Sequence, residues 1–307
     1  MAGEDARAPA AERSLAALGV TKGNDYREPV MTTEQFQMQG RNAIVVGGRG
    51  LLGRRFCSAL ADFGATVYSA DLTHLSLAAS SDTNIVSDER VTQLDVDVTQ
   101  RDSIRQLVST VKATVSTIDI LIYSVTAKPK DFYKPFTECS LEGWQLVLRA
   151  ELDGLFMTAQ EVGKQMEQQK SGSMIFLSSI YGIVGNDQRI YQGANLPELY
   201  AGLDANESQQ IFSHAVYPAA KGAVISLTRY LAAYWGAKNI RVNCISPGGL
   251  AHPGENEEFV ARYSNKVPLG RKAGLDEISG GVVFLASDAS SYITGHNLVV
   301  DGGWTTW

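Results

Sequence analysis

The chain has 307 residues, 44% of them apolar, and a net charge of -6, an ordinary composition for a globular protein with a substantial core. Its Lys and Arg residues are dispersed and form no basic stripe, which argues against nucleic-acid binding. No apolar run approaches the ~18 residues that span a bilayer, and the N-terminus lacks the pattern of a signal peptide. We therefore expect a cytoplasmic protein without a nucleic-acid or membrane partner.

Residues 1–35 are rich in alanine and charge and show no strong periodicity. They predict a flexible N-terminal extension, with a short docking helix over Ser14–Val20 as the competing interpretation. Residues 36–307 are expected to form one domain. The three cysteines lack the spacing of metal ligands and predict reduced packing residues, with no metal site: Cys57, Cys139 and Cys244.

From residue 41 onward, short apolar runs alternate with helical patterns. The predicted strands cover 42–46, 66–70, 91–96, 118–123, 173–177, 240–245 and 298–300. The predicted helices cover 51–63, 103–115, 141–166 and 217–235. Because alternating strands and helices imply right-handed crossovers, we expect an α/β fold. It would be a single domain built on a Rossmann-like, doubly wound parallel sheet with helices on both faces.

The first predicted strand leads into a glycine-rich loop that opens a helix, Gly47-Gly48-Arg49-Gly50-Leu51-Leu52-Gly53. Glycines at such a turn let the backbone approach a pyrophosphate held at the helix N-terminus. Asp71 ends the second predicted strand, at the distance where a carboxylate can hold the adenosine ribose hydroxyls. A tight turn followed by an acidic helix cap is the plain alternative.

Asp71 also distinguishes the two nicotinamide cofactors. A carboxylate ~4 Å from a 2'-phosphate costs roughly 4 kcal/mol at an effective dielectric of 20, so we expect NAD to be preferred over NADP. Arg49, in the glycine loop, is positioned to offset part of that repulsion and to leave some use of NADP.

Tyr217 and Lys221 stand one helical turn apart, downstream of the Ser178-Ser179 pair that ends an apolar run. Residues four apart share one face of a helix, and an ammonium beside a tyrosine favours the phenolate. The spacing therefore predicts a tyrosine adapted to proton transfer. A buried tyrosine beside a snorkelling lysine is the alternative interpretation.

With these features in place, residues 36–307 resemble the short-chain dehydrogenase/reductase family, mostly in its classical form. Beyond the glycine loop, Asp71, Ser179 and the Tyr217–Lys221 pair, the resemblance rests on Asp97-Val98-Thr99, on RVNCISPGG at 241–249 and on FLASDASSYITGHNLVVDGG at 284–303. It implies that Ser179 orients a substrate carbonyl or alcohol, that Tyr217 exchanges the proton and that Lys221 holds the nicotinamide ribose.

The resemblance also implies the residues that bind the cofactor and the substrate. The expected cofactor-binding residues are Gly47, Arg49, Gly50, Leu51, Leu52, Gly53, Asp71, Leu72, Asp97, Val98, Ser124, Val125, Tyr217, Lys221, Pro247, Gly248, Gly249 and Leu250. The expected substrate-binding residues are Ser179, Tyr181, Arg189, Tyr191 and His252.

Four features depart from the family pattern. The glycines at 47, 50 and 53 follow a GxxGxxG spacing closer to the extended branch, and Tyr123-Ser124-Val125-Thr126 replaces the usual NNAG. His252 replaces a threonine that often touches the carboxamide, so it contacts cofactor or substrate or simply faces solvent. Glu151, counted here among the catalytic residues, replaces an asparagine that holds a water of the proton relay. Either its carboxylate still holds the water and offsets the effect of Lys221, or the helix is shifted and Glu151 pairs with a neighbouring base.

Ser179 and Tyr217 are separated by 38 positions, far more than the family usually has. This predicts an insertion at about 185–215, at the carboxyl ends of the strands where ligands bind. The insertion offers few apolar side chains in a row. Its polar and aromatic side chains suit a polyhydroxylated or anionic ligand: Asn186, Asp187, Arg189, Tyr191, Asn195, Tyr200 and Asp204. An insertion that packs against a neighbouring subunit is the alternative.

The leading hypothesis is an NAD-dependent oxidoreductase that moves a hydride between nicotinamide and a secondary alcohol or ketone of a sugar-like or polyol substrate. The alternatives are a catalytically silent cofactor-binding scaffold and an epimerase or dehydratase acting on sugar nucleotides. The helical patterns at 141–166 and 217–235 match those of the family's dimer interface, so a homodimer or homotetramer is expected. Trp304 and Trp307 predict burial against a partner subunit or the substrate cleft, or else a tail that covers its own core.

Overall fold

The computed structural model describes residues 32–73, 88–199 and 210–307. Residues 34–307 form one compact unit. The predicted N-terminal extension, with the competing helix at Ser14–Val20, lies almost wholly outside the described residues.

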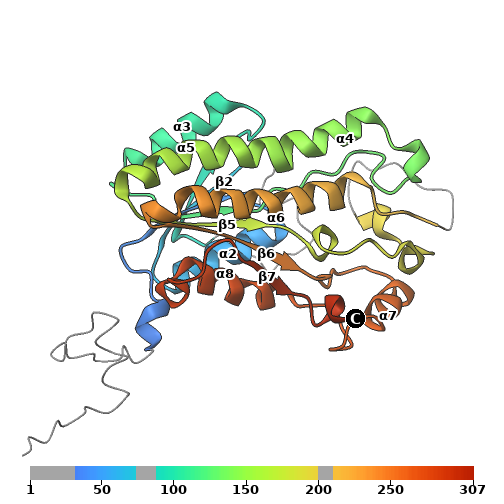
Figure 1. Ribbon diagram of the computed structural model, residues 1–307. Helices are drawn as coiled ribbons and strands as arrows, with labels where there is room; N and C mark the ends of the chain where they lie inside the picture. The colour runs from blue at the N-terminus through green and yellow to red at the C-terminus, as the bar shows by residue number, and fades with distance from the viewer. Residues whose placement is uncertain (1–31, 74–87, 200–209) are drawn as a thin grey trace, which may run out of the picture. The chain divides into compact units, whose positions relative to one another are not determined.

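A parallel sheet lies at the centre of the described chain, with seven strands in the order β3-β2-β1-β4-β5-β6-β7 (Figure 1). The strands are β1 (Asn42–Val46), β2 (Thr66–Asp71), β3 (Val91–Asp95), β4 (Ile120–Tyr123), β5 (Gly172–Leu177), β6 (Ile240–Pro247) and β7 (Asn297–Val300). The strand order reverses between β1 and β4, which are neighbours in the sheet. In doubly wound sheets this reversal opens a crevice at the carboxyl ends of the strands, where ligands bind.

Helices cover both faces of the sheet. They are α2 (Leu51–Asp62), α3 (Arg101–Lys112), α4 (Leu141–Leu148), α5 (Gly154–Gln169), α6 (Val216–Trp235), α7 (Glu257–Ser264) and α8 (Ser279–Ala286). In Figure 1, α3, α5 and α6 lie on one face, and α2 and α8 lie on the other. Ala43 and Val45 of β1 enter one buried core, and Ile44 and Val46 enter the other. Since both faces of β1 are buried, its residues 43–46 are all apolar. The predicted doubly wound fold is confirmed.

One long predicted helix is interrupted. The pattern at 141–166 forms α4, a π-helical turn (Arg149–Asp153) and then α5. The π-turn turns Glu151 inward, where it is 1% exposed. Such turns inside helices occur frequently at functional sites.

Two helices, α7 and α8, were not predicted from the sequence, and each has only 8 residues. The apolar stretch of α8 is almost continuous, and most of it is buried against the sheet, so it carries no helical period. Helix α7 is recognisable chiefly by Asn256, whose side chain accepts a hydrogen bond from Phe259 N–H and caps the first turn.

The insertion packs against its own chain. Its described residues form two 3-10 turns, Gln188–Tyr191 and Leu196–Leu199, and a bridge between Gln192 and Gln210. Its apolar side chains join a separate buried cluster with α7 and the C-terminal segment: Ile190, Tyr191, Ala194, Leu196, Ile211, Phe259, Tyr263, Val267 and Trp304. The cluster forms although the insertion has few apolar side chains in a row, because these side chains are spaced along the segment and gather only on folding.

The C-terminal tryptophans have different environments. Trp304 is buried and stacks on Tyr263 with a centroid separation of 4.4 Å, so the tail covers its own core. Trp307 is 81% exposed.

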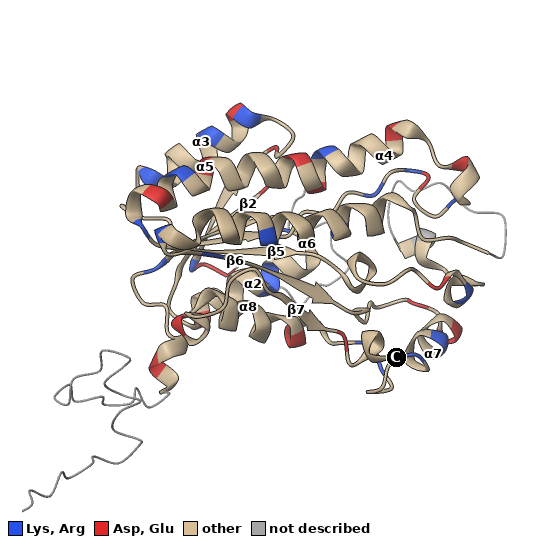
Figure 2. Cartoon of the chain, viewed as in Figure 1, with Lys and Arg blue, Asp and Glu red and all other residues tan. Residues whose placement is uncertain are grey.

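The described surface has a mixed charge pattern. Figure 2 shows Lys and Arg interspersed with Asp and Glu on the helices of both layers. Within the described ranges, no helix combines the length and apolar character that a membrane crossing requires.

Candidate active site

A cavity of about 790 Å³ lies at the carboxyl ends of the strands. Its wall begins at the glycine loop after β1, passes the ends of β2, β4, β5 and β6, and reaches the insertion and α7. The cavity therefore joins the predicted dinucleotide end to Ser179 and Tyr217.

The glycine loop forms a cradle that only glycine can build. Gly47 has φ +82, and a Cβ there would lie 2.7 Å from the carbonyl carbon of Ser124. A Cβ on Gly53 would collide with the carbonyl oxygen of Gly47. Gly50 caps α2 without a side-chain hydrogen bond, and the first turn of α2 has no acidic residue. The helix N-terminus thus faces the cavity without an internal anion, which suits a pyrophosphate.

Asp71 is fixed at the end of the cavity that the sequence predicts to bind adenosine. Its carboxylate accepts hydrogen bonds from Arg49 N–H at 3.0 Å and from Leu72 N–H at 2.9 Å, and the residue is 8% exposed. Each oxygen keeps a further lone pair, so the carboxylate can still accept from ribose hydroxyls.

The side chain of Arg49 is directed away from the cavity. Its guanidinium binds the Asp95 carboxylate at 2.8 Å and the Leu72 carbonyl at 2.9 Å, across the ends of β2 and β3. Arg49 does not line the cavity, and its backbone N–H holds the Asp71 carboxylate.

The two serines after β5 have distinct roles. The Ser178 hydroxyl donates to the backbone carbonyl of Lys221 at 2.8 Å and ties β5 to α6. The Ser179 hydroxyl oxygen accepts from Tyr181 N–H at 3.2 Å, which leaves its proton for a ligand in the cavity. This geometry favours Ser179 as the residue that meets substrate.

Tyr217 lies in the first turn of α6, half-buried in the cavity wall. Two aromatic rings, Phe132 and Tyr181, pack edge-on against it with centroid separations of 6.2 and 6.5 Å. The Nζ of Lys221 is 5.5 Å from the Tyr217 ring centroid. The ring is thereby held with a cation on its buried side.

Lys221 and Glu151 form a buried ion pair behind the tyrosine. Their charged atoms are 2.8 Å apart, and both residues are 1% exposed. Lys221 Nζ also donates to the Leu177 carbonyl at 3.2 Å, so one of its three protons remains available for a further acceptor. Burial opposes the charge, but the carboxylate of Glu151 and the Tyr217 side chain outweigh it and raise the pKa of Lys221 above its ordinary value.

Tyr123 and Glu151 brace the site where the family has asparagines. The Tyr123 hydroxyl donates to the Ala150 carbonyl in the π-turn at 2.5 Å. The second oxygen of Glu151 accepts from Ala127 N–H at 3.2 Å, in the segment after β4. The end of β4, the π-turn and Lys221 are thus connected without the NNAG amides.

The substrate end of the cavity is largely aromatic. Tyr191 of the insertion donates from its hydroxyl to that of Tyr181 at 2.9 Å, and burial raises the pKa of Tyr181 well above its ordinary value. Phe132, Tyr133, Phe259 and Tyr263 complete this end. Aromatic faces with a few hydroxyls suit a small ligand that has both C–H and O–H surfaces.

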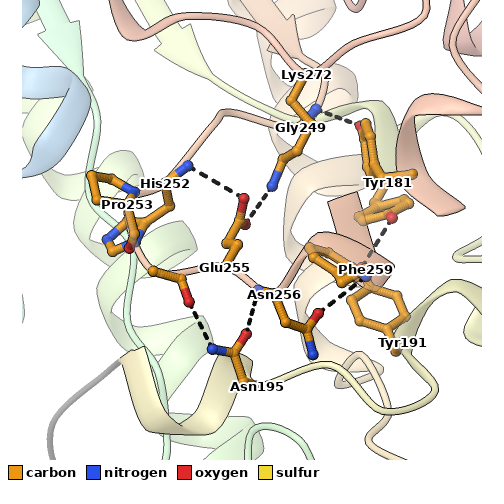
Figure 3. A network of polar contacts seen from close by, with 12 residues as sticks. Tyr181, Tyr191, Asn195, Gly249, His252, Pro253, Glu255, Asn256, Phe259 and Lys272 are labelled. Atoms are coloured by element: carbon orange, nitrogen blue, oxygen red, sulfur yellow. Dashed lines mark hydrogen bonds and ion pairs between the residues drawn. The ribbon is translucent and has the colours of Figure 1, made fainter. Parts of the chain in front are cut away.

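A polar network joins the insertion to the loop before α7 (Figure 3). Asn195 donates to the Gly254 carbonyl at 2.7 Å and accepts from Asn256 N–H at 3.0 Å. Asn256 donates back to the Gly193 carbonyl at 2.6 Å. We call these contacts between Asn195 and Asn256 the clasp. Next to the clasp, Lys272 and Glu255 form an ion pair that lines the cavity. The two loops therefore form a single lid over the substrate end.

The structure brings most of the predicted site residues together. Those that line the cavity are Gly47, Gly50, Leu51, Leu52, Gly53, Asp71, Leu72, Asp97, Val98, Ser124, Val125, Ser179, Tyr181, Tyr191, Tyr217, Pro247, Gly248, Gly249, Leu250 and His252. Lys221 and Glu151 lie directly behind this wall.

Arg189 is the predicted substrate residue that the structure places elsewhere. It does not line the cavity, its side chain is 86% exposed, and its guanidinium binds the carboxylate of Asp187 through two hydrogen bonds at 2.8 Å. The local pair, two residues apart, holds the side chain at the surface.

Three charged lining residues were not predicted from the sequence: Lys128, Glu255 and Lys272. Lys128 follows the end of β4 by five residues, a position from which a side chain reaches the cavity. Its distance from the end of β4 could therefore have identified Lys128 as a cavity residue from the sequence. The pairing of Glu255 with Lys272 joins two loops 17 residues apart, and no comparable signal in the sequence marks it.

Comparison with known proteins gives family matches over most of the chain. A family model described as short chain dehydrogenase matches residues 41–194, and one described as enoyl-(acyl carrier protein) reductase matches residues 204–305. D-threitol dehydrogenase of Mycolicibacterium smegmatis is 31% identical over 278 residues, which cover 88% of this chain and 95% of that protein.

Two solved structures share the fold. A short-chain dehydrogenase from Leptospira borgpetersenii with bound NAD+ has a TM-score of 0.75 and 27% identity, covering 92% of this chain and 100% of that one. A gluconate 5-dehydrogenase from Burkholderia cenocepacia, in complex with NADP and tartrate, has a TM-score of 0.72 and 25% identity, covering 89% of this chain and 98% of that one.

Proposed function

The chain belongs to the short-chain dehydrogenase/reductase family of oxidoreductases, and from this premise we propose that it transfers a hydride between NAD(H) and a secondary alcohol or ketone of a sugar-like or polyol substrate. The observation that carries the proposal is the arrangement of Ser179, Tyr217 and the buried Lys221 at one end of a cavity whose other end is the glycine cradle. A silent scaffold would not require this arrangement.

In this proposal, separate residues bind the cofactor, orient the substrate and transfer the proton. The glycine loop and the first turn of α2 would hold the pyrophosphate, Asp71 the adenosine ribose and Lys221 the nicotinamide ribose. The bound nicotinamide supplies the hydride donor or acceptor. Ser179 donates a hydrogen bond to the substrate oxygen, and Tyr217 takes the hydroxyl proton during oxidation or returns it during reduction. Lys221 favours the phenolate of Tyr217.

A polyol or sugar-like substrate is supported by the lid and by the relatives. The substrate end presents the hydroxyls of Tyr181 and Tyr191 beside aromatic faces, under a lid fastened by side-chain amides. Similar proteins are named for D-threitol and gluconate.

The test is a panel of alditols, aldonates and small secondary alcohols, followed at the nicotinamide absorbance. We expect NADH to accumulate stoichiometrically with ketone for at least one polyol-like substrate. Turnover of a sugar nucleotide without NADH accumulation would instead favour transient oxidation by an epimerase or dehydratase.

We also propose that the protein is a homodimer or homotetramer. Five large apolar side chains on α4, α5 and α6 are 48–65% exposed in the single chain: Leu141, Leu146, Phe156, Tyr230 and Tyr234. A patch of this kind marks an interface between subunits. Sedimentation of the purified protein as a monomer at micromolar concentration would exclude it.

The Glu151–Lys221 pair yields a pH prediction. Lys221 must be protonated to favour the phenolate, and Glu151 keeps it protonated to higher pH because it raises the pKa of Lys221 against the effect of burial. In Glu151→Gln this support is lost, the pKa of Lys221 falls, and Lys221 deprotonates earlier as pH rises. The alkaline limb of kcat/KM should therefore move down by about one to two pH units.

The matched control is Asp153→Asn, which removes an exposed carboxylate from the same π-turn and should leave the limb in place. Circular dichroism verifies that both variants fold. An unshifted alkaline limb in folded Glu151→Gln would show that Glu151 does not set the charge on Lys221.

A further inference from the structure

The ion pair of Lys272 with Glu255 lies in the wall of the cavity, with side chains only 5% and 6% exposed. The Nζ of Lys272 lies 4.9 Å from the ring centroid of Phe259 and 5.5 Å from that of Tyr263. The second oxygen of Glu255 accepts from the backbone N–H of His252 at 3.3 Å (Figure 3). Since all of these partners line the cavity, the contacts hold both charged groups at its wall.

A row of aromatic side chains leads from Tyr217 to this ion pair. The Tyr217 ring packs edge-on against Tyr181 with a centroid separation of 6.5 Å, and the Tyr181 hydroxyl accepts from that of Tyr191 at 2.9 Å. The Tyr191 ring packs against Phe259 at 5.8 Å, and Phe259 lies beside the ammonium of Lys272. A substrate whose reacting carbon lies at Tyr217 therefore meets the ion pair with a different part of its chain.

The ion pair keeps hydrogen-bonding capacity for a ligand. Lys272 has three N–H protons, and within the described ranges its hydrogen bond goes to Glu255. The Glu255 oxygens accept one bond each, from Lys272 and from His252 N–H, and each keeps a further lone pair. The pair therefore offers donors and acceptors side by side. Neighbouring hydroxyl groups require this combination, because each hydroxyl both donates and accepts.

Stability does not account for an ion pair at this place. Replacing a buried ion pair by apolar side chains of similar volume is often neutral or stabilising. Burial lowers the pKa of Lys272, and the carboxylate of Glu255 opposes this shift only in part. Charged groups that are desolvated and paired inside a cleft are typical of functional sites.

We propose that Glu255 and Lys272 bind adjacent hydroxyl groups of a neutral polyol, on the part of the substrate away from the carbon at Tyr217. The inference rests on the proposed function and names the substrate class of the same site. An anionic group would meet the carboxylate of Glu255, which already balances the charge of Lys272. An apolar group would displace water from the pair without replacing its hydrogen bonds.

The experiment compares threitol with butan-2-ol, which has the same carbon chain but a single hydroxyl. The readout is kcat/KM with NAD, because turnover requires the reacting carbon to lie at Tyr217. We expect the wild type to prefer threitol by roughly 10-fold or more, as hydrogen bonds to charged groups provide. L-tartrate, whose chain ends are carboxylates, should be oxidised less efficiently than threitol of the same configuration.

Glu255→Gln and Lys272→Gln each remove one charge of the pair. Each should lower kcat/KM for threitol by about 10-fold, since a charge-assisted hydrogen bond is lost, and leave kcat/KM for butan-2-ol within a few-fold. A purely structural role in the lid would lower both values together. Circular dichroism verifies folding, and Lys272→Gln carries the test if Glu255→Gln does not fold.

Glu257→Gln is the matched control, because Glu257 is an exposed carboxylate in the first turn of α7 and does not line the cavity. Its kcat/KM values should equal those of the wild type. A wild type that binds NADH but does not prefer threitol to butan-2-ol and tartrate, or folded variants of the pair that keep the preference, overturns the inference alone. A wild type that does not bind NADH overturns the proposed function, which separates the two failures.

Discussion

Tyr217→Phe should lower kcat by about 10² to 10⁴-fold while leaving the fold and cofactor affinity intact, since general acid-base catalysis typically contributes this much. The substitution removes only the hydroxyl. The ring remains between Phe132 and Tyr181, and the cation of Lys221 stays below it. The loss should therefore fall on proton transfer and not on packing.

The control is Tyr292→Phe, the same change at a fully exposed tyrosine that does not line the cavity. It should retain full kcat. The measurement is steady-state kinetics with the best substrate of the panel, together with NADH fluorescence to verify cofactor binding. Activity within a few-fold of the wild type in Tyr217→Phe would remove the tyrosine from the mechanism.

Asp71→Asn should shift the preference between NAD and NADP by about 10²-fold toward NADP. The Coulomb cost of a carboxylate beside the 2'-phosphate is roughly 4 kcal/mol at a dielectric of 20, and screening by solvent reduces it. Arg49 already bonds Asp95 in the wild type, so its guanidinium offsets little of that repulsion. The substitution keeps the side-chain shape and an acceptor oxygen for one of the two backbone N–H groups that bind Asp71.

This prediction is checked by kcat/KM for both cofactors in the wild type and in the variant. Asp102→Asn, an exposed carboxylate on α3, is the control and should leave the ratio unchanged. Comparable kcat/KM values for NAD and NADP in the wild type would contradict the assignment of Asp71 as the discriminating residue.

The central strands could be predicted because each is apolar on both faces. Predicted and observed bounds of β1 coincide, and those of β2 and β5 differ by one residue. Hydrophobic periodicity did not predict the elements in which the buried positions do not follow the helical repeat. Helix α8 is too apolar to show a helical face, and the π-turn leaves the helical spacing of the sequence unaltered while it redirects Glu151.

In the site, too, local motifs could be read from the sequence, whereas contacts between distant loops could not. Residues tied to a strand end or a short motif, such as Asp71, Ser179 and Tyr217, line one cavity. Arg189 does not, because Asp187 provides a partner within its own turn. The pairing of Glu255 with Lys272 and the clasp between Asn195 and Asn256 depend on how two loops meet, which local sequence does not encode.

The central claim is that Tyr217 and Ser179 serve a hydride transfer at a secondary carbinol carbon. It is tested most directly with the best substrate of the panel deuterated at that carbon. We predict one deuterium in the nicotinamide ring of each NADH formed, an equal amount of ketone, and a primary isotope effect on kcat or kcat/KM. NADH without deuterium, or substrate conversion without net NADH, would contradict the account.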